Sequence, residues 1–174
     1  MNVIRIDPLD FNNGKGLRCV IWVAGCNHHC PNCQNKEAQD PAFGKPMGQW
    51  VYDQIDKALF NPHCEGVTFS GGEATFPDNR EACQEIMAYI KDKFPQKDIW
   101  MWTGYLYEEI KDLPMMKYVD VCVDGPYIDS LNVGFNRLRY RGSSNQRVID
   151  VPSSRKKGSV VLFVDFDGKT SDEF

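Results

Sequence analysis

The sequence lacks three features that would assign it to common classes of protein. It has no excess of basic residues, since 20 Lys and Arg stand against 24 Asp and Glu, so it lacks the basic face of a nucleic-acid-binding protein. It has no run near the roughly 18 consecutive apolar residues of a membrane span. Residues 1–11 contain no apolar core like that of a signal peptide. We therefore expect a cytoplasmic protein that binds neither nucleic acid nor a membrane.

The sequence also lacks the even cysteine count of a disulfide framework. It has seven cysteines, and three of them lie close together in one short stretch. This distribution favours reduced thiols and a metal site over disulfides. We expect the remaining four to be small residues of the hydrophobic core: Cys19, Cys64, Cys83 and Cys122.

Length and composition predict one globular domain with a substantial core. The chain has 174 residues, of which 42% are hydrophobic and 25% charged, and such a chain suits a single domain. We predict that residues 1–174 form that domain, with its core at residues 14–151 and a C-terminal strand and tail at residues 152–174. No internal repeat or low-complexity segment is visible in the sequence.

Apolar periodicity and turn residues predict strands that alternate with helices. Residues 34–48 are rich in Pro, Gly and charge and are predicted as a surface excursion, and Asp78 is predicted to cap a helix. Four strands are expected at residues 17–24, 66–70, 98–103 and 118–123, and three helices at residues 49–60, 80–94 and 105–113. This order predicts parallel strands joined by right-handed crossovers.

The two ends of the chain follow a different pattern. Residues 3–6 are predicted to form a short strand that covers an edge of the sheet. Residues 147–151 and 159–164 are predicted as strands joined by a flexible linker at 153–158, and residues 170–174 as a frayed tail. Because a complete (β/α) barrel typically needs about 250 residues, we predict an α/β fold in the form of a partial, open (β/α) barrel with mostly parallel strands.

Three cysteines share a loop directly after the strand expected at residues 17–24. Cys26, Cys30 and Cys33 have the spacing C-x3-C-x2-C. A cluster of four irons has four ligand positions, so three thiolates leave one iron open to a small molecule. Neither the fourth cysteine of a ferredoxin nor the second C-x2-C knuckle of a typical zinc site is evident. The spacing therefore predicts an open iron-sulfur site.

A structural zinc site with three cysteines and one histidine is the alternative. Its fourth ligand would be His28, His29 or His63. Zinc prefers ligands from opposed short knuckles, and two adjacent histidines inside the first cysteine gap would have awkward geometry. We expect His28 and His29 to be surface residues beside the cluster. A colourless protein that contains zinc and no sulfide would favour the alternative.

A second functional loop is expected at the end of the strand at residues 66–70. Gly71, Gly72 and Glu73 follow that strand. Two glycines let the backbone approach a ligand closely, and Glu73 adds a carboxylate that could pair with an amino group. An ordinary strand-to-helix turn would also explain the glycines. The neighbouring cysteine loop favours ligand binding, because ligands gather at the carboxyl ends of parallel strands.

Together these motifs resemble the radical S-adenosylmethionine superfamily and, within it, the activating proteins of anaerobic ribonucleoside-triphosphate reductases. The resemblance extends from about residue 14 to residue 151. Besides the two loops it rests on residues 102–105, 119–125 and 141–151. The last of these stretches is the most specific, because the superfamily at large does not carry it.

The resemblance implies a radical S-adenosylmethionine oxidoreductase that activates a glycyl radical enzyme. Cys26, Cys30 and Cys33 would hold a [4Fe-4S] cluster whose open iron is chelated by S-adenosylmethionine, and reduction of the cluster would cleave the sulfonium. The 5′-deoxyadenosyl radical would then take hydrogen from a glycine of the large reductase subunit. An electron donor such as reduced flavodoxin is implied as a second partner, and the sequence leaves open whether the chain forms a homodimer.

The resemblance also implies a set of cofactor-binding residues. Residues 71–73 match the motif that receives the methionine amino group. Asn32, Cys33 and Gln34 lie where backbone contacts to the adenine are found in the superfamily. Ala74 stands where the superfamily often has proline, which lowers the rigidity expected of this loop.

Two further groups of polar residues have open roles. Thr103 and Asp124, at the ends of predicted strands, could contact the cofactor or the incoming glycine loop, or could cap helices. Four arginines could dock the reductase or be scattered surface residues: Arg137, Arg139, Arg141 and Arg147. Activation of another glycyl radical enzyme, action on a small molecule, and a zinc-stabilised interaction module stay open as alternative functions.

Overall fold

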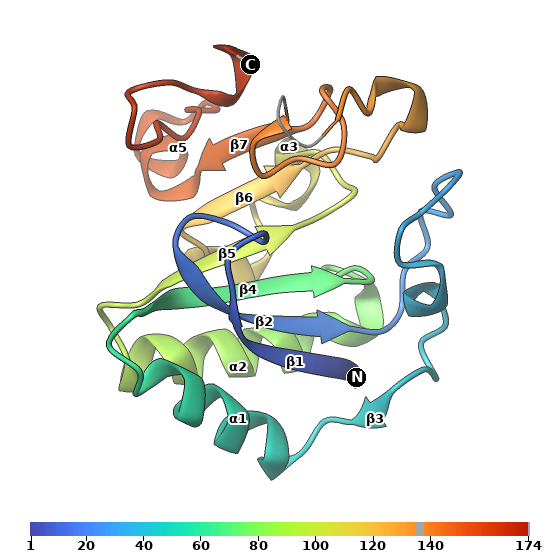
Figure 1. The fold of residues 1–174 in the computed structure, drawn as a ribbon, viewed down its shortest axis with the longest axis vertical. Helices are drawn as coiled ribbons and strands as arrows, with labels where there is room; N and C mark the ends of the chain where they lie inside the picture. Colours follow the sequence, from blue (N-terminus) through green and yellow to red (C-terminus); the bar gives the residue numbers. More distant parts are fainter. Residues whose placement is uncertain (135–137, 174) are drawn as a thin grey trace.

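A seven-stranded open sheet forms the frame of the molecule (Figure 1). The computed structural model describes residues 1–134 and 138–173, so Arg137, one of the four predicted docking arginines, lies outside the described residues. The strand order is β3-β1-β2-β4-β5-β6-β7. The strands are β1 (Asn2–Asp10), β2 (Leu17–Val23), β3 (Lys45–Pro46), β4 (Cys64–Gly71), β5 (Asp98–Trp102), β6 (Val121–Asp124) and β7 (Arg147–Asp150).

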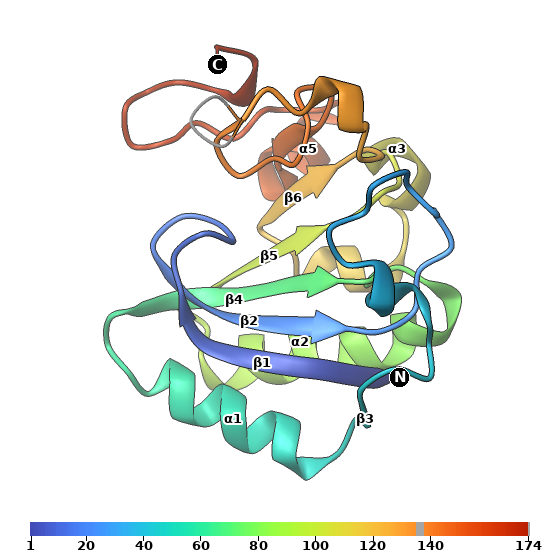
Figure 2. The same ribbon diagram turned by 45° about the vertical axis from the view of Figure 1, so that its right-hand side comes forward.

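Helices connect the central strands and cover one face of the sheet. Figures 1 and 2 show α1 and α2 together on the face beneath β1, β2 and β4. The α-helices are α1 (Gln49–Leu59), α2 (Arg80–Lys93), α3 (Tyr107–Ile110) and α5 (Val151–Lys157). Single 3-10 turns occur at η1 (Lys36–Gln39), η2 (Pro77–Asn79), η3 (Pro114–Lys117), η4 (Asp129–Leu131) and η5 (Ser171–Glu173). Among the described helices, none is long and apolar enough to span a membrane.

The four central strands are parallel, as the alternation of strands and helices predicted. Val20, Thr68, Trp100 and Val121 stand side by side across β2, β4, β5 and β6. The outer pairs β3-β1, β1-β2 and β6-β7 are antiparallel, so the strands are only partly parallel rather than mostly so. The fold is a mixed α/β fold with an open sheet. The carboxyl ends of β2, β4, β5 and β6 lie at one edge of it.

Each face of the sheet has its own apolar core. Alternate strand residues point to opposite faces, and those on the helix side pack with Ile55 of α1 and Ile86 of α2. The four cysteines outside the loop are fully buried, which confirms their prediction as core residues. On the opposite face a smaller cluster forms around Trp100, Val123 and Val148. This second face is the one that carries the candidate site.

Two predictions for the first half of the chain were wrong in detail. The N-terminal strand runs from Asn2 to Asp10 and lies between β3 and β2, so it is not the edge of the sheet. Asp78 does not cap α2, because Asn79 occupies the cap position, and in the described structure no side chain makes the capping bond. Asn79 instead donates to the carbonyl oxygens of Ala24 and Glu73, which both lie beside the site.

The C-terminal segment differs most from its prediction of linker, strand and frayed tail. The predicted linker is α5, which Asp150 caps by accepting from the Ser153 amide at 2.8 Å and which ends at Gly158. In the described part of residues 159–164 no strand forms, and the contact with β7 is a single bridge between Ile149 and Leu162. The C-terminal tail is attached to the domain as well, since the hydroxyl of buried Ser171 accepts a hydrogen bond from the backbone amide of Val148 in β7.

Candidate iron-sulfur site

A cavity of about 420 Å³ lies at the carboxyl ends of the parallel strands, on the face opposite α1 and α2. The ends of β2, β4 and β5 supply Trp22, Ser70 and Trp102 to its wall. The loops that follow these strands supply the cysteines, the Gly-Gly-Glu turn and the turn at residues 103–104. This is the position at which ligands gather in α/β folds.

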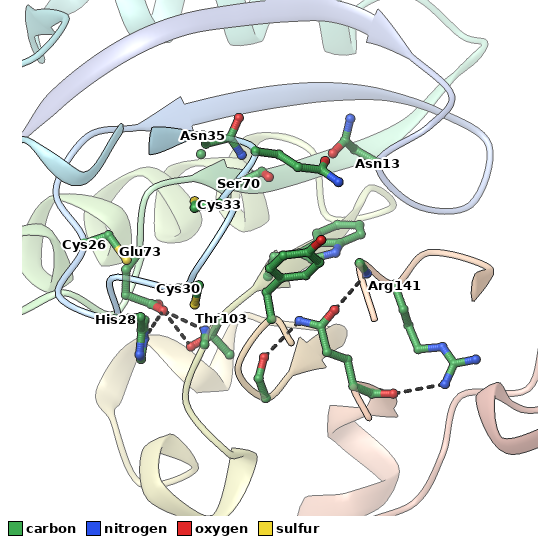
Figure 3. Close-up of a pocket in the computed structure, with 18 of the residues that line it drawn as sticks. Asn13, Cys26, His28, Cys30, Cys33, Asn35, Ser70, Glu73, Thr103 and Arg141 are labelled. Atoms are coloured by element: carbon green, nitrogen blue, oxygen red, sulfur yellow. Dashed lines mark hydrogen bonds and ion pairs between the residues drawn. The ribbon is translucent and has the colours of Figure 1, made fainter. Parts of the chain in front are cut away.

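All three loop cysteines border this cavity. Figure 3 shows Cys26 and Cys30 on the side of His28, Glu73 and Thr103, whereas Cys33 lies nearer Ser70. All three are free thiols that are partly exposed. Burial raises the pKa of the Cys26 thiol to about 11, so a bound cation is needed to keep it as a thiolate at neutral pH.

The three thiols do not form a site for a single metal ion in the described structure. Among the described residues, no three His, Cys, Asp or Glu side chains converge closely enough to hold a single ion. A zinc site needs four ligand atoms around one ion, whereas the cysteines of a cluster each bind a different iron. A cavity bordered by three separated thiols therefore suits a [4Fe-4S] cluster.

None of the three histidines is placed as a fourth zinc ligand. His28 lies against Glu73, and exposed His29 contacts the side chain of Gln39. His63 precedes β4, at the opposite end of the strands. The prediction of a surface position holds for His29 and is wrong for His28, whose side chain is only 18% exposed.

The Gly-Gly-Glu loop is bonded through its backbone to the start of the cysteine loop. The amide of Gly72 donates to Val23 and the amide of Glu73 donates to Gly25, both at 2.8 Å. A Cβ at position 72 would lie 2.6 Å from the Gly25 carbonyl oxygen. Together with the two bonds from Asn79, these contacts fix the loop although Ala74 replaces proline.

The Glu73 carboxylate is buried and its two oxygens accept five hydrogen bonds. Oε1 accepts from the amide and hydroxyl of Thr75, at 2.9 and 2.6 Å. Oε2 accepts from His28 at 2.9 Å, from the Thr103 hydroxyl at 3.1 Å and from the Gly104 amide at 2.8 Å. With 1% of its surface exposed, this carboxylate lines the cavity and joins three loops of the site.

The other predicted cofactor residues divide into two groups. Gln34 and Thr103 line the cavity with the two glycines. Asn32 is exposed, and its side chain donates to Asp129 at 2.9 Å, outside the cavity wall. Asp124 is buried and accepts from the amide of Tyr107, the first residue of α3, and from Arg147. The geometry of Asp124 is that of the helix-capping alternative.

Three of the four predicted docking arginines make contacts within the chain. Arg141 is buried, and it donates to the carbonyl oxygens of Leu138, Ser144 and Gln146. Arg139 pairs with Asp165 and Asp167. Arg147 pairs with Glu108 and Asp124. These contacts show that the three arginines hold loops of the domain in place.

Sequence reasoning missed much of the cavity wall. The missed residues that line it include Asn12, Asn13, Trp22, His28, Ser70, Trp102, Tyr127, Tyr140 and Gln146. A period of two along the strands could have identified Trp22, Ser70 and Trp102, because they share one face. Strand β2 hides this period, because most of its residues are apolar and buried on both faces of the sheet.

Comparisons with known proteins agree with this chemistry. Residues 12–149 match the family model described as a 4Fe-4S single cluster domain. Over 148 residues the chain is 40% identical to the anaerobic ribonucleoside-triphosphate reductase-activating protein of Enterobacteria phage T4, a match that covers 85% of this chain and 93% of that protein. The protein of the same name from Escherichia coli (strain K12) is 36% identical over 152 residues, covering 85% and 97%. A third, from Vibrio cholerae, is 36% identical over 151 residues, covering 84% and 96%. The chain therefore belongs to the family of anaerobic ribonucleoside-triphosphate reductase-activating proteins.

Proposed function

We propose that this protein activates an anaerobic ribonucleoside-triphosphate reductase by generating a glycyl radical on its large subunit. One observation carries the proposal: three free thiols, the Gly-Gly-Glu loop and the turn at residues 103–104 all border one cavity at the carboxyl ends of parallel strands. Family membership supports the same activity. The protein is thus an oxidoreductase of the radical S-adenosylmethionine type.

Cys26, Cys30 and Cys33 are the proposed ligands of a [4Fe-4S] cluster. When bound and reduced, such a cluster with one open iron supplies the electron for cleavage of S-adenosylmethionine, and the released 5′-deoxyadenosyl group takes a hydrogen atom from glycine. The chain contributes the three thiols and the wall of the cavity. Trp22 and Trp102 supply broad apolar surface there and help to exclude water.

Residues of the neighbouring loops are the proposed binding site for S-adenosylmethionine. The cavity beside the cysteines is lined by Gly71, Gly72, Glu73, Gln34 and Thr103. Asn32 would act through its backbone, because its side chain is bonded to another loop. Asp124 acts at a distance from the cofactor by fixing the start of α3.

The open sheet is proposed to be a partial (β/α) barrel of the radical S-adenosylmethionine type, in one domain over residues 1–174. Away from the cysteines, the cavity wall carries uncharged amide groups, among them those of Asn12 and Asn13. Groups of this kind suit the backbone of an extended peptide. We propose that the glycine-bearing loop of the reductase enters on this side.

Two expectations from the sequence accompany the proposal. A small electron-transfer protein such as reduced flavodoxin is the proposed source of the electron. A location in the cytoplasm is proposed on the basis of the sequence and the family resemblance, and the sequence leaves the formation of a homodimer open.

Reductive cleavage of S-adenosylmethionine tests the function directly. The protein is purified without oxygen, reconstituted with iron and sulfide, reduced with dithionite, and assayed for 5′-deoxyadenosine with and without an anaerobic ribonucleotide reductase large subunit. We expect 5′-deoxyadenosine, and with the reductase an organic radical signal in the electron paramagnetic resonance spectrum. A correctly loaded cluster that gives neither product would contradict the proposal.

Two cysteine variants provide a matched control. Cys30→Ala removes a proposed ligand and should abolish both the retained iron and the cleavage. Cys83→Ala removes a thiol that is fully buried beside Met1, so it should lower stability while keeping the cluster. An equal loss of iron in the two variants would show that the division between ligand and core cysteines is wrong.

A further inference from the structure

We propose that His28 is a positioning residue, which locks the first half of the cysteine loop to the Gly-Gly-Glu loop and to the turn after β5. The inference rests on the proposed function, because it assigns a role to His28 within the same site. His28 lies between Cys26 and Cys30 and is itself neither a thiol nor a part of the Gly-Gly-Glu motif.

The His28 ring contacts both of the neighbouring loops. Its Nε2 donates to Glu73 Oε2 at 2.9 Å, since a carboxylate can only accept. The His28 ring packs against the Tyr105 ring in an edge-to-face arrangement, with ring centroids 4.4 Å apart. Figure 3 shows the hydrogen bonds that join His28 and Thr103 to Glu73, beside Cys26 and Cys30. The ring therefore bridges the cysteine loop to two other segments.

The turn after β5 leaves room for this ring. A Cβ at Gly104 would lie 2.5 Å from Cδ2 of His28, so any side chain at position 104 would displace the imidazole. The backbone amide of the same glycine donates to Glu73. Next to His28, the amide group of Asn27 and the hydroxyl of Tyr105 form a second link, at 3.1 Å. The cysteine loop and the turn after β5 are thus in close contact at both Gly104 and Tyr105.

The hydrogen bonds of Glu73 indicate what the contact does. Its other four donors come from Thr75, Thr103 and Gly104, in two loops of the cavity wall. His28 is the donor that attaches the cysteine loop to this carboxylate. Without it, the cysteine loop keeps its backbone bonds at Gly25 and the link from Asn27 to Tyr105, but loses its side-chain attachment to the Gly-Gly-Glu loop.

A looser attachment has a defined consequence for ligand affinity. S-adenosylmethionine must contact the metal site and the Gly-Gly-Glu loop together under the proposed function. If the two loops sample several relative positions, the observed dissociation constant rises by the inverse of the competent fraction. His28 therefore affects affinity for S-adenosylmethionine more than it affects the capacity to bind iron.

The test compares His28→Ala, His28→Gln and His29→Asn. Gln can donate to Glu73 as His28 does, whereas Ala cannot. His29 is exposed and has a φ of 48°, and among the described residues its side chain hydrogen-bonds to Gln39. His29→Asn is a matched control, because Asn tolerates that conformation. Iron and sulfide content, S-adenosylmethionine binding by equilibrium dialysis, and hydrogen exchange of the metal-free protein are measured for each.

We expect His28→Ala to keep the iron content of the unmodified protein and to bind S-adenosylmethionine about 10-fold more weakly, which corresponds to about 1.4 kcal/mol. His28→Gln should recover most of the affinity, and His29→Asn should behave as the unmodified protein. In the metal-free protein, His28→Ala should speed exchange of the Gly104 amide. This readout needs neither cluster nor activity.

Several outcomes would overturn the proposal. Unchanged affinity and unchanged exchange at Gly104 in His28→Ala would show that the contact positions nothing. Loss of iron as complete as in Cys30→Ala would make His28 a ligand instead. If the unmodified, correctly loaded protein fails to bind S-adenosylmethionine, the proposed function fails, while the exchange result still decides whether His28 joins the loops.

Discussion

Gly72→Ala probes the closest backbone contact of the site. The new Cβ would lie 2.6 Å from the carbonyl oxygen of Gly25 and 2.8 Å from that of Ala38. Both are backbone atoms, so relief cannot come from a side-chain rotation. The Gly-Gly-Glu loop must move away from the segment that leads into Cys26, which strains the bonds from Gly72 to Val23 and from Glu73 to Gly25.

These contacts indicate how much Gly72→Ala lowers the free energy of unfolding. Forcing one extra carbon into a packed contact costs about 1–3 kcal/mol, and weakening one or two buried hydrogen bonds adds about 1 kcal/mol each. We expect Gly72→Ala to lower the free energy of unfolding by about 2–5 kcal/mol, or the melting temperature by about 4–20 °C for a chain of this size. Urea unfolding of the metal-free protein measures the loss.

Gly48→Ala is the matched control. Gly48 has an extended backbone before α1, and a Cβ there would meet only the Trp50 ring, at an ordinary 3.7 Å. We expect a change below about 1 kcal/mol, the scale of an altered helix cap. If Gly72→Ala unfolds at the same urea concentration as Gly48→Ala, the loops are not in the tight contact described, and the account of the Gly-Gly-Glu loop is wrong.

Two further variants test contacts of the segment at residues 138–150. Burial and a hydrogen bond to Asp165 raise the pKa of Tyr140 to about 12, whereas an unfolded tyrosine ionises at about pH 10. Between these two pH values unfolding releases a proton, so the free energy of unfolding falls as the pH rises. This fall should be smaller in Tyr140→Phe when the urea midpoints are compared. Arg147→Lys should lower the free energy of unfolding by about 1–3 kcal/mol, because lysine lacks the forked guanidinium group that contacts both Glu108 and buried Asp124. An unchanged urea midpoint would refute this prediction.

The central strands could be predicted because their signals are local. The apolar run at residues 17–24 is bounded by glycines, and the helix predicted at residues 49–60 has clear apolar periodicity. α5 was missed because its seven residues are too few for a periodic pattern. Its signals were the cap residue Asp150 and the stop at Gly158, which indicate helix ends rather than a buried face.

Only those parts of the site that consist of residues close together in the sequence could be predicted. The cysteine spacing and the Gly-Gly-Glu triplet are of that kind, and their residues line the cavity together. The contact of His28 with Glu73 joins positions 45 residues apart, so no local pattern could reveal it. The roles of Asp124 and Arg147 likewise depend on a pairing across β6 and β7 that the sequence does not encode locally.

The buried carboxylate of Glu73 gives the three loops of the site one common support. His28, Thr75 and Thr103 donate to it from the cysteine loop, the Gly-Gly-Glu loop and the turn after β5. Removing one donor leaves the other bonds to hold the carboxylate, whereas removing the carboxylate leaves every donor without its acceptor. The effects of changing these residues are therefore not additive. It follows that Glu73 can be essential to the site by holding its loops together, without a direct bond to the ligand.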